Sequence, residues 1–262
     1  MSPQRTEPRG LLTFIIIWFG QLVSELGSGL TGFGLGVYLY QETGSAAQFA
    51  LNSFFYVLPV GLMAVFSGAL ADRWSRRHML ILADTGQALA TLAIALLLFA
   101  DRLAVWHIYA LTIVSAIMHS FQGPAYEASI ATLVPKQHLG RAASLAEIKR
   151  AVSGLIAPAL AGFLVVAIGL GGVLLIDLAT FLVALVTLLV VRIPDPAVTG
   201  EETRARRSLW HDVRFGWRYL RERPGLLGLL SVSFVHDFFA NAALVLVVPM
   251  VLSFAGADAA GI

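Results

Sequence analysis

The sequence predicts an all-α membrane protein, built as a bundle of about seven transmembrane helices. Hydrophobic residues make up 58% of its 262 residues and charged residues only 13%, whereas soluble domains are close to half apolar and about a quarter charged. Mean hydropathy is +0.79. Apolar runs of the length that a bilayer requires, about 20 residues, recur along the chain.

The apolar runs predict helices at about residues 11–40, 46–71, 78–100, 104–125, 141–168, 171–192 and 225–253. The start of the first run also resembles the core of a signal peptide. That alternative is weak, because the run continues past signal length and no small-residue cleavage site follows it. The predicted domains are a six-helix unit at 1–192, a polar connection at 193–224 and a further helix within 225–262.

Composition and motifs exclude several classes of protein. The formal net charge of +2 is too small to indicate nucleic-acid binding, and the absence of cysteine excludes disulfides, zinc-thiolate sites and cysteine nucleophiles. The sequence has no G-x-x-x-x-G-K-[ST] run for phosphate binding, no H-E-x-x-H and no G-x-S-x-G. We therefore expect neither ATP hydrolysis nor a membrane enzyme, and neither a cofactor nor a metal.

Basic residues are distributed unevenly over the predicted loops. Of the 18 lysines and arginines, all but Arg102 fall on one side of the membrane if the helices alternate strictly in direction. Because Lys and Arg are enriched in cytoplasmic loops, this bias predicts a multi-pass protein with a cytoplasmic N-terminus. The residues after the last predicted helix are then outside.

The connection at 193–224 mixes apolar and basic residues. Pro194 ends the preceding helix, and Arg214 and Arg218 then alternate with aromatic residues such as Trp217. This pattern predicts an amphipathic helix at the membrane surface, with its arginines facing anionic lipid. A basic linker that only enforces topology would explain it equally well.

The connection after the second predicted helix carries a recognisable motif. It reads Gly68-Ala69-Leu70-Ala71-Asp72-Arg73-Trp74-Ser75-Arg76-Arg77. The segment resembles the G-x-L-x-D-R-x-G-R-[KR] signature between the second and third helices of major facilitator superfamily transporters. Its place in the predicted topology matches, and one departure is Ser75, where the family has glycine.

This resemblance implies an architecture and a role for the motif. Gly68, Leu70, Asp72, Arg73, Arg76 and Arg77 would form a gating loop that holds the two halves of the transporter together on the cytoplasmic side. The alternative is that the arginines only anchor the topology. Such a transporter has twelve helices in two six-helix halves, so the chain would supply the first half and one helix of the second. It would then be a partial sequence, or a half-transporter that pairs with a second chain.

A second resemblance lies on the fifth predicted helix. Gly154, Pro158 and Gly162 fall in a run similar to the G-x-x-x-G-P-x-x-G-G element of drug-proton antiporters, with alanines at 157 and 161 in place of glycines. Small residues four apart allow helices to pack closely, and proline bends a helix. The element favours an exporter, although a kinked packing helix without directional meaning explains it as well.

Two further segments resemble the branch of macrolide and siderophore exporters. They are 121–127, which contains Pro124, and 217–224, which precedes the last predicted helix. The resemblance implies a secondary active exporter of amphipathic small molecules in the inner (plasma) membrane, coupled to protons and monomeric when complete. The alternatives are a siderophore or lysophospholipid carrier and a transport-dead membrane scaffold.

Ionisable residues within the predicted spans are candidates for the substrate or proton site, because charges inside a bilayer are costly. Glu25 is the strongest candidate, since it lies mid-helix among glycines and serines that would line a water-filled cavity. The other candidates are Asp237, Asp177, His119 and Glu127. For Asp177, His119 and Glu127 a structural role is an open alternative. We expect Asp84 to pair with a base such as Arg150.

Overall fold

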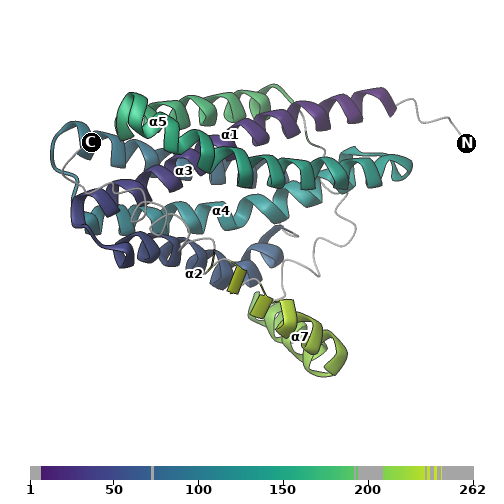
Figure 1. Cartoon of the computed structure of the whole chain (residues 1–262). Helices are drawn as coiled ribbons and strands as arrows, with labels where there is room; N and C mark the ends of the chain where they lie inside the picture. The colour runs from purple at the N-terminus through teal and green to yellow at the C-terminus, as the bar shows by residue number, and fades with distance from the viewer. Residues whose placement is uncertain are drawn as a thin grey trace, which may run out of the picture.

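The computed structural model describes residues 7–71, 74–191, 193, 209–233, 235–236, 239–240 and 243, and within them the regular secondary structure is helical throughout. The helices are α1 (Glu7–Thr43), α2 (Ala46–Ala71), α3 (Arg76–Phe99), α4 (Val105–Leu133), the short 3-10 helix η1 (Lys136–His138), α5 (Leu139–Val190) and α7 (Leu209–Arg221). Helices α1 to α5 lie side by side along one axis, and α7 lies apart from them next to α2 (Figure 1).

Within the described residues, four helical segments are long and apolar enough to cross a membrane. They are Gly10–Thr43, Ala46–Ala64, Arg76–Phe99 and the 55-residue segment Lys136–Val190. Helix α4 has 29 residues, which is enough to span a bilayer, although it is not one of these four segments. Of the predicted helix at 225–253, the structure describes an apolar helix at Pro224–Ser233, and most of the remainder lies outside the described residues.

Helix α5 consists of two span-length halves that meet at Gly169. Gly169 has φ 68° and ψ 172°, a conformation that glycine adopts without the steric cost that a Cβ would bring. The break separates 139–168 from 170–190, as the predicted helices at 141–168 and 171–192 require. The two halves and α1 to α4 therefore form a bundle of six helical segments, each of a length that could cross a bilayer.

Two buried clusters define the two ends of this bundle. One cluster joins Phe14, Ala71, Leu133 and Leu188, and the connections before α3 and before α5 meet at that end. We call it the basic end, because Arg76 and Arg77 at the start of α3, Lys136 in η1 and Arg141 near the start of α5 lie there. The other cluster includes Leu39, Ile94, Ile108 and Leu174, and the loop with Arg102 lies beside it.

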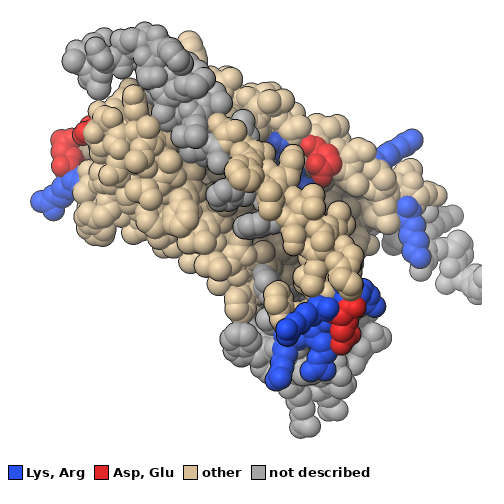
Figure 2. All heavy atoms as spheres, turned by 60° about the horizontal axis from the view of Figure 1, so that its bottom comes forward, with Lys and Arg blue, Asp and Glu red and all other residues tan. Residues whose placement is uncertain are grey.

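The outer surface of the bundle is mostly apolar. Leu155, Phe163, Leu182 and Leu96 each expose more than 60% of their surface, as residues that face lipid would. On the face seen in Figure 2, charged side chains form small groups toward the ends and on the segment at the bottom, and other residues cover the rest.

Helix α1 packs closely along both halves of α5 because its glycines leave room. A Cβ added to Gly29 would lie 2.7 Å from the Cβ of Ala157, and one added to Gly27 would lie 2.8 Å from Oδ1 of Asp177. Both distances are shorter than atoms tolerate. This arrangement resembles the small-residue packing of membrane helices generally.

The run around Pro158 contributes to this packing through its alanines. Ala157 and Ala161 are fully buried against α1, whereas a Cβ on Gly154 would meet nothing within 4 Å and one on Gly162 would only touch Phe33. The expectation that Gly154 and Gly162 are the close-packing positions is therefore wrong for the described helices. Backbone dihedral angles remain helical at Pro158, and the only non-helical residue inside α5 is Gly169.

The polar connection contains the helix that the sequence predicted. Helix α7 spans Leu209–Arg221 and contacts α2. Arg214, Arg218, Arg221 and Arg223 are all exposed, and the largest basic group in Figure 2 lies on this segment. Its position at the membrane surface stays a prediction.

Candidate functional site

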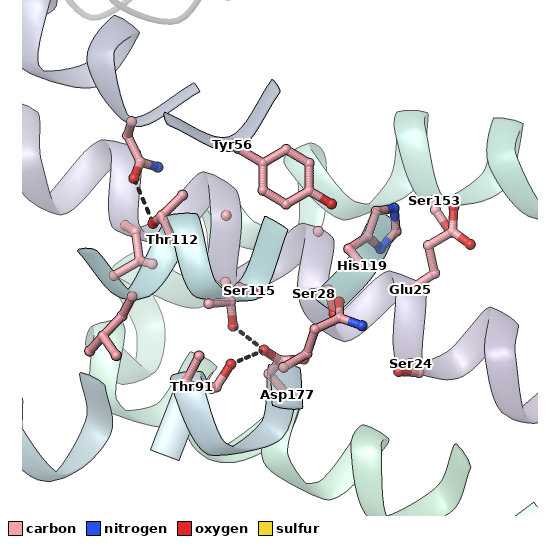
Figure 3. Close-up of a pocket in the computed structure, with 18 of the residues that line it drawn as sticks. Ser24, Glu25, Ser28, Tyr56, Thr91, Thr112, Ser115, His119, Ser153 and Asp177 are labelled. Carbon is pink, nitrogen blue, oxygen red and sulfur yellow. Dashed lines mark hydrogen bonds between the residues drawn. The ribbon is translucent and has the colours of Figure 1, made fainter. Parts of the chain in front are cut away.

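A cavity of about 480 Å³ lies inside the bundle between α1, α2, α3, α4 and α5. This volume is within the range of small-molecule sites. Its polar lining is formed by Ser24, Glu25, Ser28, Thr31, Asn52, Ser53, Tyr56, Gln87, Thr91, Thr112, Ser115, His119, Gln122, Arg150, Ser153 and Asp177. Leu35, Val57, Ile94 and Leu111 add apolar surface. Figure 3 shows how these side chains converge from several helices.

Glu25 is paired with a lysine that the sequence interpretation had placed among the cytoplasmic bases. Lys149 Nζ lies 2.5 Å from Glu25 Oε2 and 4.8 Å from the ring centroid of Tyr126. Lys149 is buried, with 9% of its surface exposed. It belongs to the inward face of α5, because Ser153, Ala157 and Ala161 follow it at intervals of four and are also buried. This four-residue spacing in the sequence was the signal that could have identified Lys149 as an inward-facing residue.

Asp84 is held by two amides and not by an arginine. Gln21 Nε2 donates to Asp84 Oδ2 and Gln122 Nε2 donates to Asp84 Oδ1, each at 2.8 Å. The expected pairing of Asp84 with Arg150 is therefore wrong. Arg150 instead contacts Glu127 at 3.3 Å and Glu147 at 3.0 Å, because its side chain extends toward solvent whereas Asp84 lies inside the bundle.

Asp177 lies on the wall of the cavity and is 1% exposed. Its Oδ2 accepts hydrogen bonds from Thr31 Oγ1 at 2.7 Å and Thr91 Oγ1 at 3.1 Å. Its Oδ1 is buried and has no hydrogen-bond partner. Asp177 is thus part of the central site, although one sequence interpretation had assigned it a purely structural partner toward the outer side.

The remaining candidates are placed differently. His119 lines the cavity beside Tyr56, with ring centroids 5.7 Å apart, and Figure 3 shows both rings side by side. The Glu127 side chain is 65% exposed in its pair with Arg150 and does not line the cavity. Asp237 lies outside the described residues, so the expectation that it faces Glu25 stays a prediction.

One face of α1 connects the carboxylates of Glu25, Asp84 and Asp177. Gln21, Glu25, Ser28 and Thr31 recur at helical spacing on that face, and ten residues of helix span about 15 Å. Gln21 contacts Asp84, Glu25 contacts Lys149, and Thr31 contacts Asp177. The sequence interpretation selected this polar face of α1 but not the partners on α3 and α5.

The loop motif at the basic end is only partly described. Asp72 and Arg73 lie outside the described residues. Arg77 donates from Nε to the carbonyl of Leu188 at 2.9 Å and from Nη2 to that of Leu189 at 2.8 Å, so it binds carbonyls that the end of α5 leaves free. Leu70 packs against the cluster at the basic end.

Two residues of the motif adopt unstrained positions. Ser75 has φ −58°, which any residue adopts, so a serine fits where the family has glycine. A Cβ on Gly68 would meet nothing within 4 Å among the described residues. No described helix therefore approaches Gly68 closely.

The chemistry of the cavity suits the binding of a small organic molecule. Among the described residues, no group of three or more His, Asp or Glu side chains is placed to hold a metal ion. Hydroxyls, amides and one ion pair line the cavity together with aliphatic surface. Such a lining accepts an organic molecule that has both polar and apolar parts.

Comparison with known proteins places the chain among transporters. Residues 17–261 match the model of the Major Facilitator Superfamily. Macrolide efflux protein A of Streptococcus pyogenes is 29% identical over 228 residues, 87% of this chain and 56% of the relative. Macrolide efflux protein A of Enterococcus faecalis is 28% identical over 182 residues, 69% of this chain and 55% of the relative.

A third relative matches almost the whole chain. The MFS-type transporter YfiS of Bacillus subtilis is 27% identical over 261 residues, 98% of this chain and 60% of the relative. The chain therefore spans between 55% and 60% of the length of these three relatives.

Proposed function

The chain belongs to the major facilitator superfamily, and from that premise we propose that it works as a secondary active exporter of amphipathic small molecules, driven by the proton gradient. Family membership excludes the alternative of a membrane enzyme. The carrying observation is the cavity of about 480 Å³, in which a partly buried Glu25–Lys149 pair and the Asp177 carboxylate face aliphatic surface.

Alternating access gives the cavity its role in this proposal. Spans on all sides contribute to the lining, so a relative movement of the helices can change which end of the cavity is open. The relatives named for macrolide efflux support export of bulky amphipathic compounds. Macrolides and lipophilic dyes are therefore the first substrates to test.

The decisive experiment measures accumulation of a macrolide and a dye in cells that lack their own efflux pumps. We expect expression of the gene to lower accumulation, and a protonophore to abolish the difference. Glu25→Gln should abolish it as well, because it removes the carboxylate that pairs with Lys149. Glu147→Gln is the matched control, since Glu147 is an exposed acid outside the cavity lining.

Two results would refute the proposal. One is equal accumulation with and without the gene for every compound tested. The other is export that survives the protonophore and Glu25→Gln alike, since the cavity acid would then have no part in proton coupling.

We also propose that the loop motif gates transport at the cytoplasmic side. Arg77 supports this role, because its two hydrogen bonds join the start of α3 to the end of α5. A movement of the loop would therefore displace both helices. Asp72→Asn should then leave membrane insertion intact but stop export. Normal export by Asp72→Asn would remove the gating role.

Orientation in the inner membrane, with the N-terminus in the cytoplasm, belongs to the proposal too. The grouping of Arg76, Lys136 and Arg141 at one end of the bundle and Arg102 at the other supports it. A cysteine introduced at Ser75 should react with a membrane-impermeant thiol reagent only from the cytoplasmic side. A cysteine at Arg102 should react only from outside.

Helix α7 is the proposed contact with anionic lipid. Arg214, Arg218 and Arg221 are exposed on it, and each basic residue near an anionic surface contributes about 1 kcal/mol. Replacing all three with glutamine should weaken association of a peptide spanning 209–223 with vesicles that contain phosphatidylglycerol. If the parent peptide and the glutamine variant bind the vesicles equally, the segment acts only as a basic linker that enforces topology.

A further inference from the structure

Three carboxylates inside the described bundle, those of Glu25, Asp84 and Asp177, differ in how their charge is satisfied. Glu25 has the ammonium group of Lys149. Asp84 has one amide donor on each oxygen and does not line the cavity. Asp177 has two hydroxyl donors on Oδ2 and none on Oδ1, so it alone lines the cavity with an oxygen left unsatisfied.

An unsatisfied carboxylate oxygen is unfavourable inside a membrane protein. Asp177 is 1% exposed, so bulk water does not solvate Oδ1, and a buried polar atom without a partner carries the full cost of its desolvation. Among the described residues, no Lys, Arg or His forms an ion pair with Asp177. The Ser28 and Thr180 hydroxyls also lie near this carboxylate, but no positive charge among the described residues neutralises it.

Space near Oδ1 restricts what that charge can be. Helix α1 approaches so closely that a Cβ on Gly27 would lie 2.8 Å from Oδ1. Helix α1 therefore leaves no room for a bulky group on its side of Oδ1, which favours a small cation. The hydroxyls of Thr31 and Thr91 converge on the same carboxylate from two other helices, as Figure 3 shows for Thr91.

We propose that Asp177, with Thr31 and Thr91, forms the binding site of the coupling cation, a proton or a sodium ion that binds at Oδ1 from the cavity. The inference rests on the proposed function and adds the place where the driving ion binds. Binding neutralises Asp177, which joins α1, α3 and the second half of α5. The cation therefore changes the contacts among helices that surround the substrate cavity.

Other ionisable groups face the same space from the neighbouring helices. They are Glu25 on α1, Tyr56 on α2, His119 on α4 and Arg150 on α5, with Lys149 and Asp84 behind the lining. His119 also titrates near neutral pH in its ordinary state. A pH effect therefore counts as evidence for Asp177 only if it survives His119→Gln.

The first experiment measures binding without transport. The purified full chain in detergent is heated at a series of pH values and, separately, at a series of sodium concentrations balanced with choline. We expect the midpoint of thermal unfolding to depend on one of the two cations, and Asp177→Asn to abolish that dependence. Asp84→Asn and His119→Gln should retain it.

A second pair of variants tests the inference if Asp177→Asn does not fold. Thr31→Val removes a hydroxyl that donates to Asp177, and a hydrogen bond to a charged group corresponds to about a tenfold change in affinity. Thr31→Val should thus shift the cation midpoint by about that factor. Thr112→Val is the matched control, because its hydroxyl is also buried in the cavity but pairs with Asn52, and it should not shift the midpoint.

The outcomes are separable. A pH dependence lost in Asp177→Asn identifies the proton, and a sodium dependence lost in it identifies the sodium ion. A cation dependence that Asp177→Asn retains, or the absence of any, overturns the inference. Export in cells tests the proposed function independently: if the parent chain exports and Asp177→Asn exports with unchanged dependence on the cation, only the cation site is refuted.

Discussion

Removing one partner of the Glu25–Lys149 pair should destabilise the protein far more than removing both. The pair is partly buried, with side-chain exposures of 25% for Glu25 and 11% for Lys149. Breaking a buried pair leaves an uncompensated charge and costs about 3–5 kcal/mol. Because Glu25 keeps a quarter of its exposure, we expect the lower end, about 3 kcal/mol, for Lys149→Met.

The two single variants should differ in a defined direction. In Glu25→Gln the ammonium group of Lys149 retains its contact with the ring of Tyr126, whose centroid lies 4.8 Å from Nζ. Such a cation–π contact contributes about 0.5–1 kcal/mol. In Lys149→Met the Glu25 carboxylate has no such second partner among the described residues. Glu25→Gln should therefore cost about 2 kcal/mol and Lys149→Met more.

The assay is a double-mutant cycle on the free energy of unfolding, measured by reversible denaturation of the purified protein in mixed micelles. The double variant Glu25→Gln/Lys149→Met carries neither charge, so it should lie within about 1 kcal/mol of the parent protein. The reasoning is wrong if the two single effects simply add in the double variant, because additivity means that the groups do not interact.

Three further perturbations follow from the packing of the helices. Gly29→Ala should destabilise the protein by about 1–3 kcal/mol, because its Cβ would meet Ala157, and Gly154→Ala, whose Cβ meets nothing within 4 Å, should leave the unfolding midpoint unchanged. Gly169→Ala should cost about 1–2 kcal/mol of unfolding free energy through its φ of 68°, and an unchanged midpoint would contradict the break in α5. Arg77→Ala should lower the free energy of unfolding by about 1–3 kcal/mol and speed proteolysis after Val190, because the carbonyls of Leu188 and Leu189 lose their hydrogen-bond donor. Arg102→Ala, at the opposite end of the bundle, is the control and should change neither quantity.

Most of the fold could be predicted from the sequence because the bilayer imposes a length on each span. The apolar runs placed α2 and the ends of α1 and α3 within a few residues, and the glycines around 169 marked the division of α5. Helix α4 was predicted to end at 125 but continues to Leu133. Polar residues such as Glu127 and Ser129 do not interrupt a helix near the end of a bundle.

The pairing of residues inside the bundle could not be predicted in the same way. Glu25 could be identified as a candidate because a charge in the middle of an apolar helix is costly inside a bilayer. Its partner did not stand out, because Lys149 lies close to other basic residues in the sequence and only its register along α5 turns it inward. Asp84 was assigned to Arg150 by charge alone, whereas Gln21 and Gln122 satisfy it without a charge.

The most direct test of the account is the accessibility of the cavity, and the chain contains no cysteine that would interfere. Single cysteines at Ser53, Ser115 and Ser153 line the cavity, and cysteines at Leu96 and Leu182 lie on the apolar outer surface. A membrane-impermeant methanethiosulfonate should modify the first set in membranes, and an exported compound should slow that reaction, while the second set stays unmodified. Lining cysteines that never react, or that react equally fast with and without the compound, would contradict a substrate cavity at this place.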